Sequence, residues 1–235
     1  MNKFKTKALA IIAAMATLCM TLTGCGEKLA PADQTIGALF ELAAKDNPAK
    51  MKDLLGFASE DDVRSAFFEE GADTAMIDEI KNELTAAGVE MTDEQIQGLS
   101  DSMTAMMNKI SYTAEITSEE KDKVVVTLKV SGYSEDEMTQ IMMDAANTMQ
   151  ENLMASEEDQ LAISTGDMEV FNKYMTDYIN DFMNGLASME LDPEPVEVTV
   201  SCEKLTVDVS GKSKVAWLPT DMDGFASNVE SAMIH

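Results

Sequence analysis

Apolar positions recur with a helical period through the first half of the chain. Stripes of such positions lie at residues 36–43, 51–55, 77–84 and 96–110. A spacing of three and four residues places these side chains on one face of a helix. The last stripe follows Thr92 and Gln95, which have the spacing of a capping box at a helix start. The pattern predicts four helices before residue 111.

The period changes from 3.6 to 2 after Ile110. Apolar and polar residues alternate over 112–117 and again over 124–130. Such alternation is typical of strands with one buried face. The polar stretch from Ser118 to Asp122 is short enough to close an antiparallel hairpin.

Helical periodicity returns after the hairpin. Ser134 and Glu137 form a second capping box, ahead of an apolar stripe from Met138 to Leu153. The acidic run 157–159 predicts a break, and a second helix follows from about Asp167. We therefore expect a two-helix insertion at about 134–190.

Strand periodicity resumes at Val196. Apolar residues occupy even positions up to Val200 but odd positions from Leu205 to Val209. The buried face should therefore flip, unless a bulge or turn near Glu203 and Lys204 resets the register. Residues 210–212 predict a hairpin turn before a last strand with Trp217, and the tail from residue 223 is either a short helix or frayed.

These elements predict an α+β fold. N-terminal helices should pack on a curved antiparallel sheet of four or five strands, with the long two-helix insertion between the strand pairs. The sequence shows no internal repeat, so residues 33–235 are expected to form a single domain that carries the insertion.

A basic and then apolar segment begins the chain. Three lysines precede an apolar run of fifteen residues, from Ala8 to Leu22. The run is shorter than the ~18 residues that a membrane-spanning helix needs, which favours a signal peptide over residues 1–24.

The end of this leader, Leu22-Thr23-Gly24-Cys25, resembles the lipobox of bacterial lipoproteins. The resemblance implies cleavage before Cys25, attachment of a diacylglyceryl group to its sulfur, and a tether over 25–32. It implies a protein anchored by acyl chains on the extracytoplasmic face of the cell membrane.

Composition narrows the range of partners. Of 17 basic side chains, three leave with the leader; the remaining 14 face 43 acidic ones, a formal charge of −29. Such a charge repels nucleic acid. Cys202 would be the one cysteine left unmodified, which predicts no internal disulfide. The single histidine is His235, which argues against catalytic triads and histidine-based metal sites.

The order of elements also carries a resemblance. Early helices, a curved meander, a Gly211-Lys212 turn and a strand with Trp217 resemble the layout of cystatin-like and nuclear-transport-factor-like lipoproteins of Gram-positive bacteria. That group includes binders and a few enzymes. The resemblance is one of layout and implies no specific functional residue.

The strongest candidate binding residues are aromatic. A low-polarity groove could be lined by Phe171, Tyr174, Tyr178, Phe182 and Trp217. Packing in the core is the competing explanation for them. Among the 20 methionines, 103, 106 and 107 or 138, 142 and 143 have a spacing that could hold Cu(I), but core packing or an adaptable apolar groove explains them better.

Motifs for catalysis, cofactors or metals are missing from the sequence. We therefore expect a lipoprotein that is not an enzyme, needs no cofactor or metal, and binds a small or extended apolar ligand or an envelope partner. One alternative is a purely structural or protein-interaction module. The other is a hydrolase that uses acidic clusters such as Asp61-Asp62, although such runs are usually solvated faces.

Overall fold

A computed structural model describes residues 29–68, 81–82, 85–86, 89 and 92–235. Two compact units make up the chain. The sheet unit comprises residues up to Thr74, Ile110–Gly132 and Pro193–His235, and the helical unit comprises Ala75–Lys109 and Tyr133–Asp192. The predicted leader and Cys25 lie outside the described residues, as does most of the helix expected at 77–84. The single domain expected over 33–235 stays a prediction.

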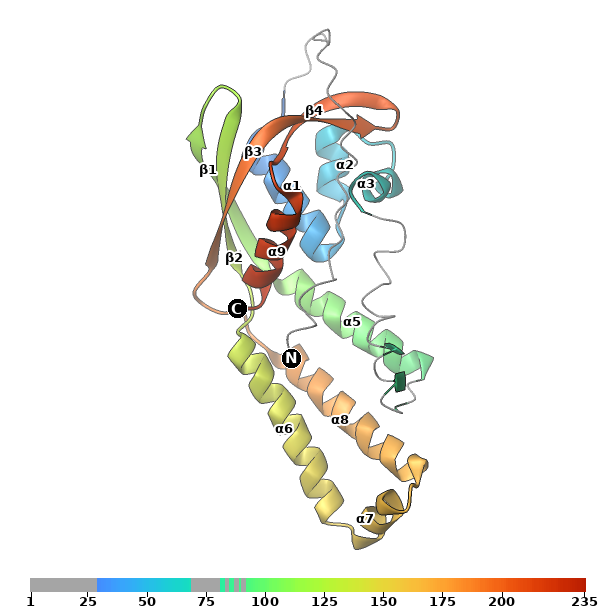
Figure 1. The fold of residues 1–235 in the computed structure, drawn as a ribbon. Coiled ribbons are helices and arrows are strands. Elements are labelled where there is room, and N and C mark those ends of the chain that lie inside the picture. Colours follow the sequence, from blue (N-terminus) through green and yellow to red (C-terminus); the bar gives the residue numbers. More distant parts are fainter. Residues whose placement is uncertain (1–28, 69–80, 83–84, 87–88, 90–91) are drawn as a thin grey trace. The chain divides into compact units, whose positions relative to one another are not determined.

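The sheet unit is built on a four-stranded antiparallel meander in the order β1-β2-β3-β4 (Figure 1). Its strands are β1 (Ser111–Glu119), β2 (Lys123–Ser131), β3 (Val196–Val209) and β4 (Lys212–Pro219). The sheet curves strongly along β3 and β4. The α+β class and the strand pairs on either side of the insertion are thus confirmed, with four strands in the described sheet.

The described residues of the sheet unit form four helices: α1 (Ala32–Lys45), α2 (Ala49–Leu55), α3 (Glu60–Phe67) and α9 (Met222–Met233). α1 contacts β1, β2 and β4, while α9 contacts β2, β3 and β4. Ile36, Leu39 and Phe40 of α1 are almost completely buried, as are Val126 and Leu128 of β2. The core of this unit therefore lies between the helices and the sheet.

The buried face of β3 changes sides along the strand. Val198, Val200 and Cys202 are buried in the first half, and Val207 and Val209 in the second. No register shift interrupts the pairing of β3 with β2 or β4. The first half pairs with β2 and the second with β4 alone, so the curved strand presents opposite faces to the core at its two ends. The expected flip is real, and it needs no bulge.

The tail, for which the sequence left two alternatives open, is the helix α9. Its buried side chains recur at helical spacing, from Met222 through Phe225 and Val229 to Met233. Asp221 caps the helix, because its Oδ1 accepts a hydrogen bond from the Gly224 N–H at 2.9 Å. The tail is therefore a part of the core.

Four helices of the helical unit are described: α5 (Asp93–Lys109), α6 (Glu135–Met154), α7 (Glu157–Ser164) and α8 (Met168–Ser188). The predicted capping box of α5 is present in both directions. The Gln95 N–H donates to Thr92 Oγ1 at 3.3 Å, and the Thr92 N–H donates to Gln95 Oε1 at 2.8 Å. α8 packs against both α5 and α6.

The acidic run 157–159 is not a break, and here the sequence interpretation was wrong. Its residues form the first turn of α7, which Ser156 caps by accepting a hydrogen bond from the Asp159 N–H at 3.2 Å. Carboxylates are favourable there because the free N–H groups give a helix start a partial positive charge. The insertion thus holds two long helices and a short third one.

Candidate functional site

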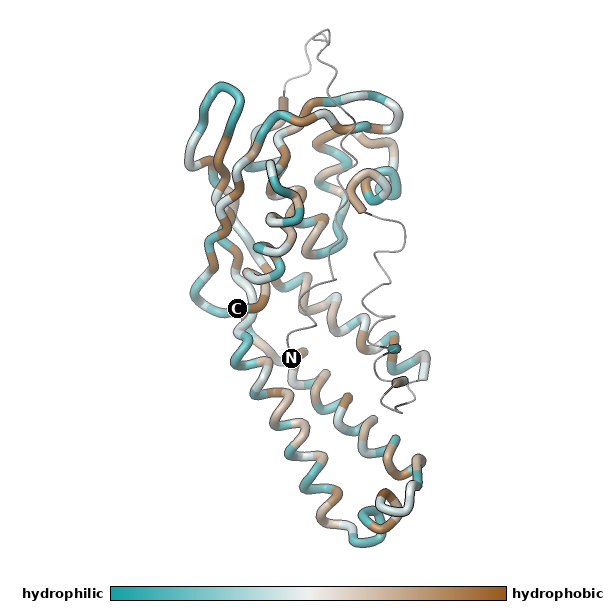
Figure 2. The backbone as a smooth tube through the Cα atoms, in the orientation of Figure 1, coloured by the Kyte–Doolittle hydropathy of each residue, from teal (hydrophilic) through white to brown (hydrophobic). Residues whose placement is uncertain are grey.

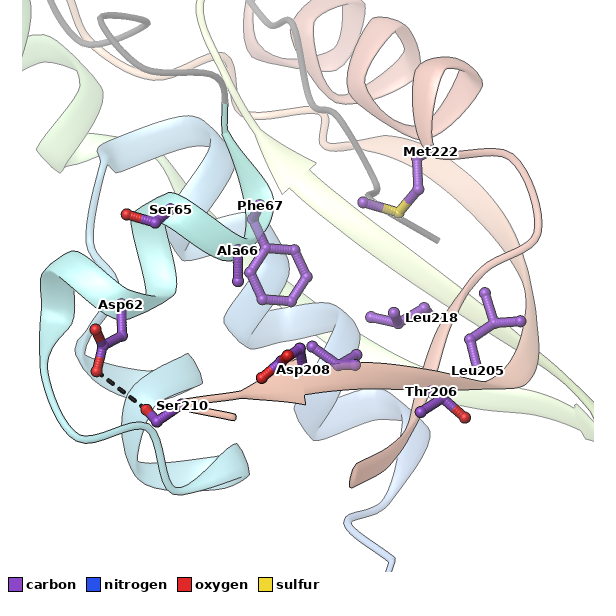
Figure 3. Close-up of a pocket in the computed structure, with 11 residues that line it drawn as sticks. Asp62, Ser65, Ala66, Phe67, Leu205, Thr206, Asp208, Ser210, Leu218 and Met222 are labelled. Carbon is purple, nitrogen blue, oxygen red and sulfur yellow. Dashed lines mark hydrogen bonds between the residues drawn. The ribbon is translucent and has the colours of Figure 1, made fainter. Parts of the chain in front are cut away.

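A hollow of about 300 Å³ lies between α3 and the β3–β4 hairpin (Figure 3). Residues of α3, β3, β4 and the start of α9 line it. Its lining comprises Asp62, Ser65, Ala66, Phe67, Leu205, Thr206, Val207, Asp208, Ser210, Leu218 and Met222. Its volume is at the lower end of the range for small-molecule sites, ~300–1,000 Å³.

The hairpin turn places one wall of this hollow. Ser210 and Gly211 both have positive φ, 52° and 82°, the geometry of a tight two-residue turn. The Gly211 N–H donates to Asp208 Oδ1 at 2.7 Å. The Ser210 hydroxyl donates to Asp62 Oδ2 at 3.0 Å and accepts from the Ala58 N–H at 3.3 Å, so the turn is tied to the start of α3.

The floor of the hollow is apolar and its rim is polar. Phe67, Val207, Leu218 and Met222 are buried below the rim. Ser65, Thr206, Asp208 and Ser210 are exposed and Asp62 is half-buried. Such a floor can hold an apolar group, and the rim oxygens can accept hydrogen bonds from its polar end.

A second and broader hollow, of about 660 Å³, contains the predicted residue Trp217. It is lined by residues 29–32, where the chain enters α1, and by Ile116 and Val124. Lys204 lies over the indole ring, with Nζ 4.9 Å from the centroid, and donates to the Lys121 carbonyl at 2.8 Å. Trp217 itself is buried and forms part of the wall.

The other four predicted aromatic residues lie on α8 in the helical unit. Tyr174 is buried, and its hydroxyl donates to Asp159 Oδ2 at 2.8 Å; this hydrogen bond raises the pKa of Tyr174. Tyr178 and Phe182 stack with their centroids 6.5 Å apart, and with Phe171 they are partly exposed. These four residues line neither hollow. A groove shared with Trp217 stays a prediction.

Cys202 is a core residue of the sheet unit. Its side chain is 1% exposed, and burial raises the pKa of the thiol to about 12. A thiol with such a pKa is almost entirely protonated at neutral pH and is a poor nucleophile. In the described part of the chain, no three His, Cys, Asp or Glu side chains are grouped to hold a metal ion.

The sequence missed the hollow at α3 because it missed α3. Two features of the sequence indicate this helix: Ser59 can cap its start, and Glu60 to Asp62 supply an acidic first turn. The sequence analysis interprets Asp61-Asp62 only as a carboxylate cluster. The Asp62 N–H donates to Ser59 Oγ at 3.1 Å. The pattern matches the start of α7, so the same rule explains both acidic runs.

Within the described residues, no helix combines the length and the apolar character needed to cross a membrane.

No protein-family model and no curated protein matches this chain. Among solved structures, that of ycdA, a candidate lipoprotein of Bacillus subtilis subsp. subtilis str. 168, is similar to this chain. The two share 14% sequence identity with a TM-score of 0.52, over 87% of this chain and 56% of the other. At this identity the likeness shows a similar fold alone. The present chain spans little more than half the length of its neighbour.

Proposed function

We propose that this protein is an extracytoplasmic lipoprotein, anchored through Cys25, that binds a small apolar ligand in the hollow between α3 and the β3–β4 hairpin. The observation that carries the ligand site is the apolar floor of Phe67, Val207, Leu218 and Met222 beneath an accessible polar rim. The proposed role is one of binding, and within it Asp62 and Asp208 hold the turn by accepting hydrogen bonds from Ser210 and Gly211.

The anchor rests on the lipobox-like sequence 22–25, and the fold shared with a candidate lipoprotein supports it. The layout that the sequence predicts, which resembles that of cystatin-like and nuclear-transport-factor-like lipoproteins, is consistent with the same anchor. Cleavage before Cys25 leaves seven residues, 25–31, ahead of α1, and these span roughly 25 Å at most when extended. The sheet unit would then work close to the outer face of the membrane.

The anchor is tested by the substitution Cys25→Ala. The wild-type protein should fractionate with membranes and carry acyl chains detectable by mass spectrometry, while the variant should be uncleaved or released. Acyl chains on the Cys25→Ala protein would refute the anchor and leave the ligand site untouched.

The ligand site is tested by native mass spectrometry of the purified full-length protein and by titration with Nile red, a neutral apolar dye. The protein should bind the dye or release a small molecule on denaturation. Ala66→Trp, which fills the hollow, should abolish either signal, whereas Ala187→Trp at an exposed position of α8 should not. Equal signals from both variants, or none from the wild type, would refute the site.

A further inference from the structure

The far end of the α6–α8 hairpin exposes large apolar side chains. Met154 ends α6, Leu161 lies in α7 and Met168 begins α8; they are 67%, 65% and 50% exposed. α7 crosses this end of the hairpin (Figure 1), and hydrophobic and hydrophilic positions lie side by side on it (Figure 2). We call residues 151–169 the tip.

Polar contacts help to order the tip. No side chain of α7 is fully buried, and Ala162 and Ile163 are only partly shielded. The Gln160 amide donates to the carbonyls of Leu153 and Met154 at 3.2 and 3.0 Å, which satisfies the end of α6. Tyr174 donates to Asp159 and ties α8 to α7. Met154, Leu161 and Met168 stay largely exposed at this end of the hairpin.

The charged side chains of the tip itself are all acidic. Residues 151–169 contain six carboxylates and no lysine or arginine. The whole segment 133–192 contains 14 carboxylates and one cationic side chain, Lys173. Nine of the 20 methionines also lie in this segment, and Met142 and Met143 of α6 are exposed as well.

We propose that the tip is a docking surface for a cationic amphipathic helix of another polypeptide. Methionine side chains are flexible and polarizable, so they adapt to different apolar partners. The carboxylates complement lysine and arginine, and they disfavour nucleic acid, anionic lipid and a second acidic copy of the same surface. The exposed apolar side chains of the tip predict an apolar stripe on the partner, and its carboxylates predict a basic face.

The test measures binding of a synthetic amphipathic helix of about 16 leucine and lysine residues, labelled for fluorescence anisotropy. Full-length protein is used in a neutral detergent, with the detergent alone as the blank. The peptide should bind at about 50 mM salt and about tenfold more weakly at 300 mM. A scrambled peptide without an apolar stripe, and one with glutamate in place of lysine, should bind far more weakly.

Two tip variants separate the apolar and the charged contributions. Leu161→Ser/Met168→Ser should weaken binding about tenfold at either salt concentration. Glu157→Gln/Glu158→Gln should weaken it about fivefold at low salt and little at high salt. Both pairs are exposed, and far-UV circular dichroism checks that α6–α8 remain folded.

Matched controls change the same residue types elsewhere. Val215→Ser removes a side chain that is 53% exposed on β4, and Glu115→Gln/Glu190→Gln removes two exposed carboxylates outside the tip. These variants should bind the peptide like the wild type. Loss of binding equal to that of the tip variants would mean attraction by overall charge alone and would overturn the proposal, as would equal binding of the glutamate peptide.

Discussion

The two units of this chain bury their apolar side chains to very different degrees. In the sheet unit, residues such as Ile36, Phe40 and Leu128 are completely shielded from solvent. In the helical unit, the 20-residue helix α6 buries Ala145 alone, and the eight-residue α7 buries nothing. A helix hairpin has fewer layers than a sheet covered by helices, so most apolar residues of α6 and α7 are only partly enclosed. These two helices therefore leave more apolar surface exposed than the sheet unit does.

The largest expected effect comes from truncating one leucine in each unit. Leu128→Ala removes a completely buried side chain from β2 and should lower the free energy of unfolding by about 3–4 kcal/mol. Leu153→Ala, at a half-buried position of α6, should cost about 1 kcal/mol.

Both variants can be followed by urea unfolding. Trp217 is the single tryptophan and lies in the sheet unit, so its fluorescence reports on that unit, while hydrogen exchange reports on α6. The contrast between the units would be refuted by equal losses in the two variants.

Two glycines of the helical unit sharpen the comparison. A Cβ at Gly185 of α8 would collide with Ile141 Cγ2 of α6, whereas one at Gly98 of α5 would meet Met183 Cε at an ordinary 3.6 Å. Alanine favours a helix over glycine by about 1 kcal/mol. Gly98→Ala should therefore stabilise by about 0.5–1 kcal/mol, and Gly185→Ala should destabilise by about 1 kcal/mol.

Thermal denaturation followed by far-UV circular dichroism measures both changes. A gain in midpoint from Gly185→Ala as large as that from Gly98→Ala would show that α6 and α8 do not meet closely at this residue.

The periodicity of the sequence predicted most helices and strands of both units. The capping residues Thr92 and Ser134, the hairpin of β1 and β2, and the turn at Ser210 were found, because each depends on local backbone chemistry. Helices α3 and α7 were missed, because a run of carboxylates resembles a solvent-exposed loop. Only the serine ahead of each run indicates that the carboxylates form the first turn of a helix.

Sites were harder to predict than elements. The hollow at α3 joins Asp62 to Ser210, 148 residues apart in the chain, and periodicity holds no information on such a pairing. The aromatic stripe of α8 was visible in the sequence, but its degree of burial depends on how many layers cover it. Local patterns indicate which face of an element is apolar, and only tertiary structure decides whether that face is covered.

The smallest expected effect is a different response of the two units to added salt, which follows from their different charges. In the sheet unit, Lys129 lies 3.4 Å from Glu197 and Lys123 lies 3.2 Å from Glu203 across neighbouring strands. In the segment 133–192, 14 carboxylates face a single lysine, and Asp177 and Asp181 stand one turn apart on α8. Added salt weakens repulsion and attraction alike, so it should affect the two units in opposite directions.

Hydrogen exchange at about 50 mM and 500 mM sodium chloride measures this difference. Amides of α6 and α8 should exchange about two- to threefold more slowly at high salt, because screening relieves a repulsion of a few tenths of a kcal/mol per like-charged pair. Amides of β2 and β3 should be unchanged or slightly faster, since exposed ion pairs contribute little. Asp177→Asn/Asp181→Asn should reproduce part of the salt effect at low salt, and Glu197→Gln should not. Equal slowing in both units would instead mean that salt strengthens apolar burial in each unit alike. Repulsion between the carboxylates of the helical unit would then not measurably destabilise its helices.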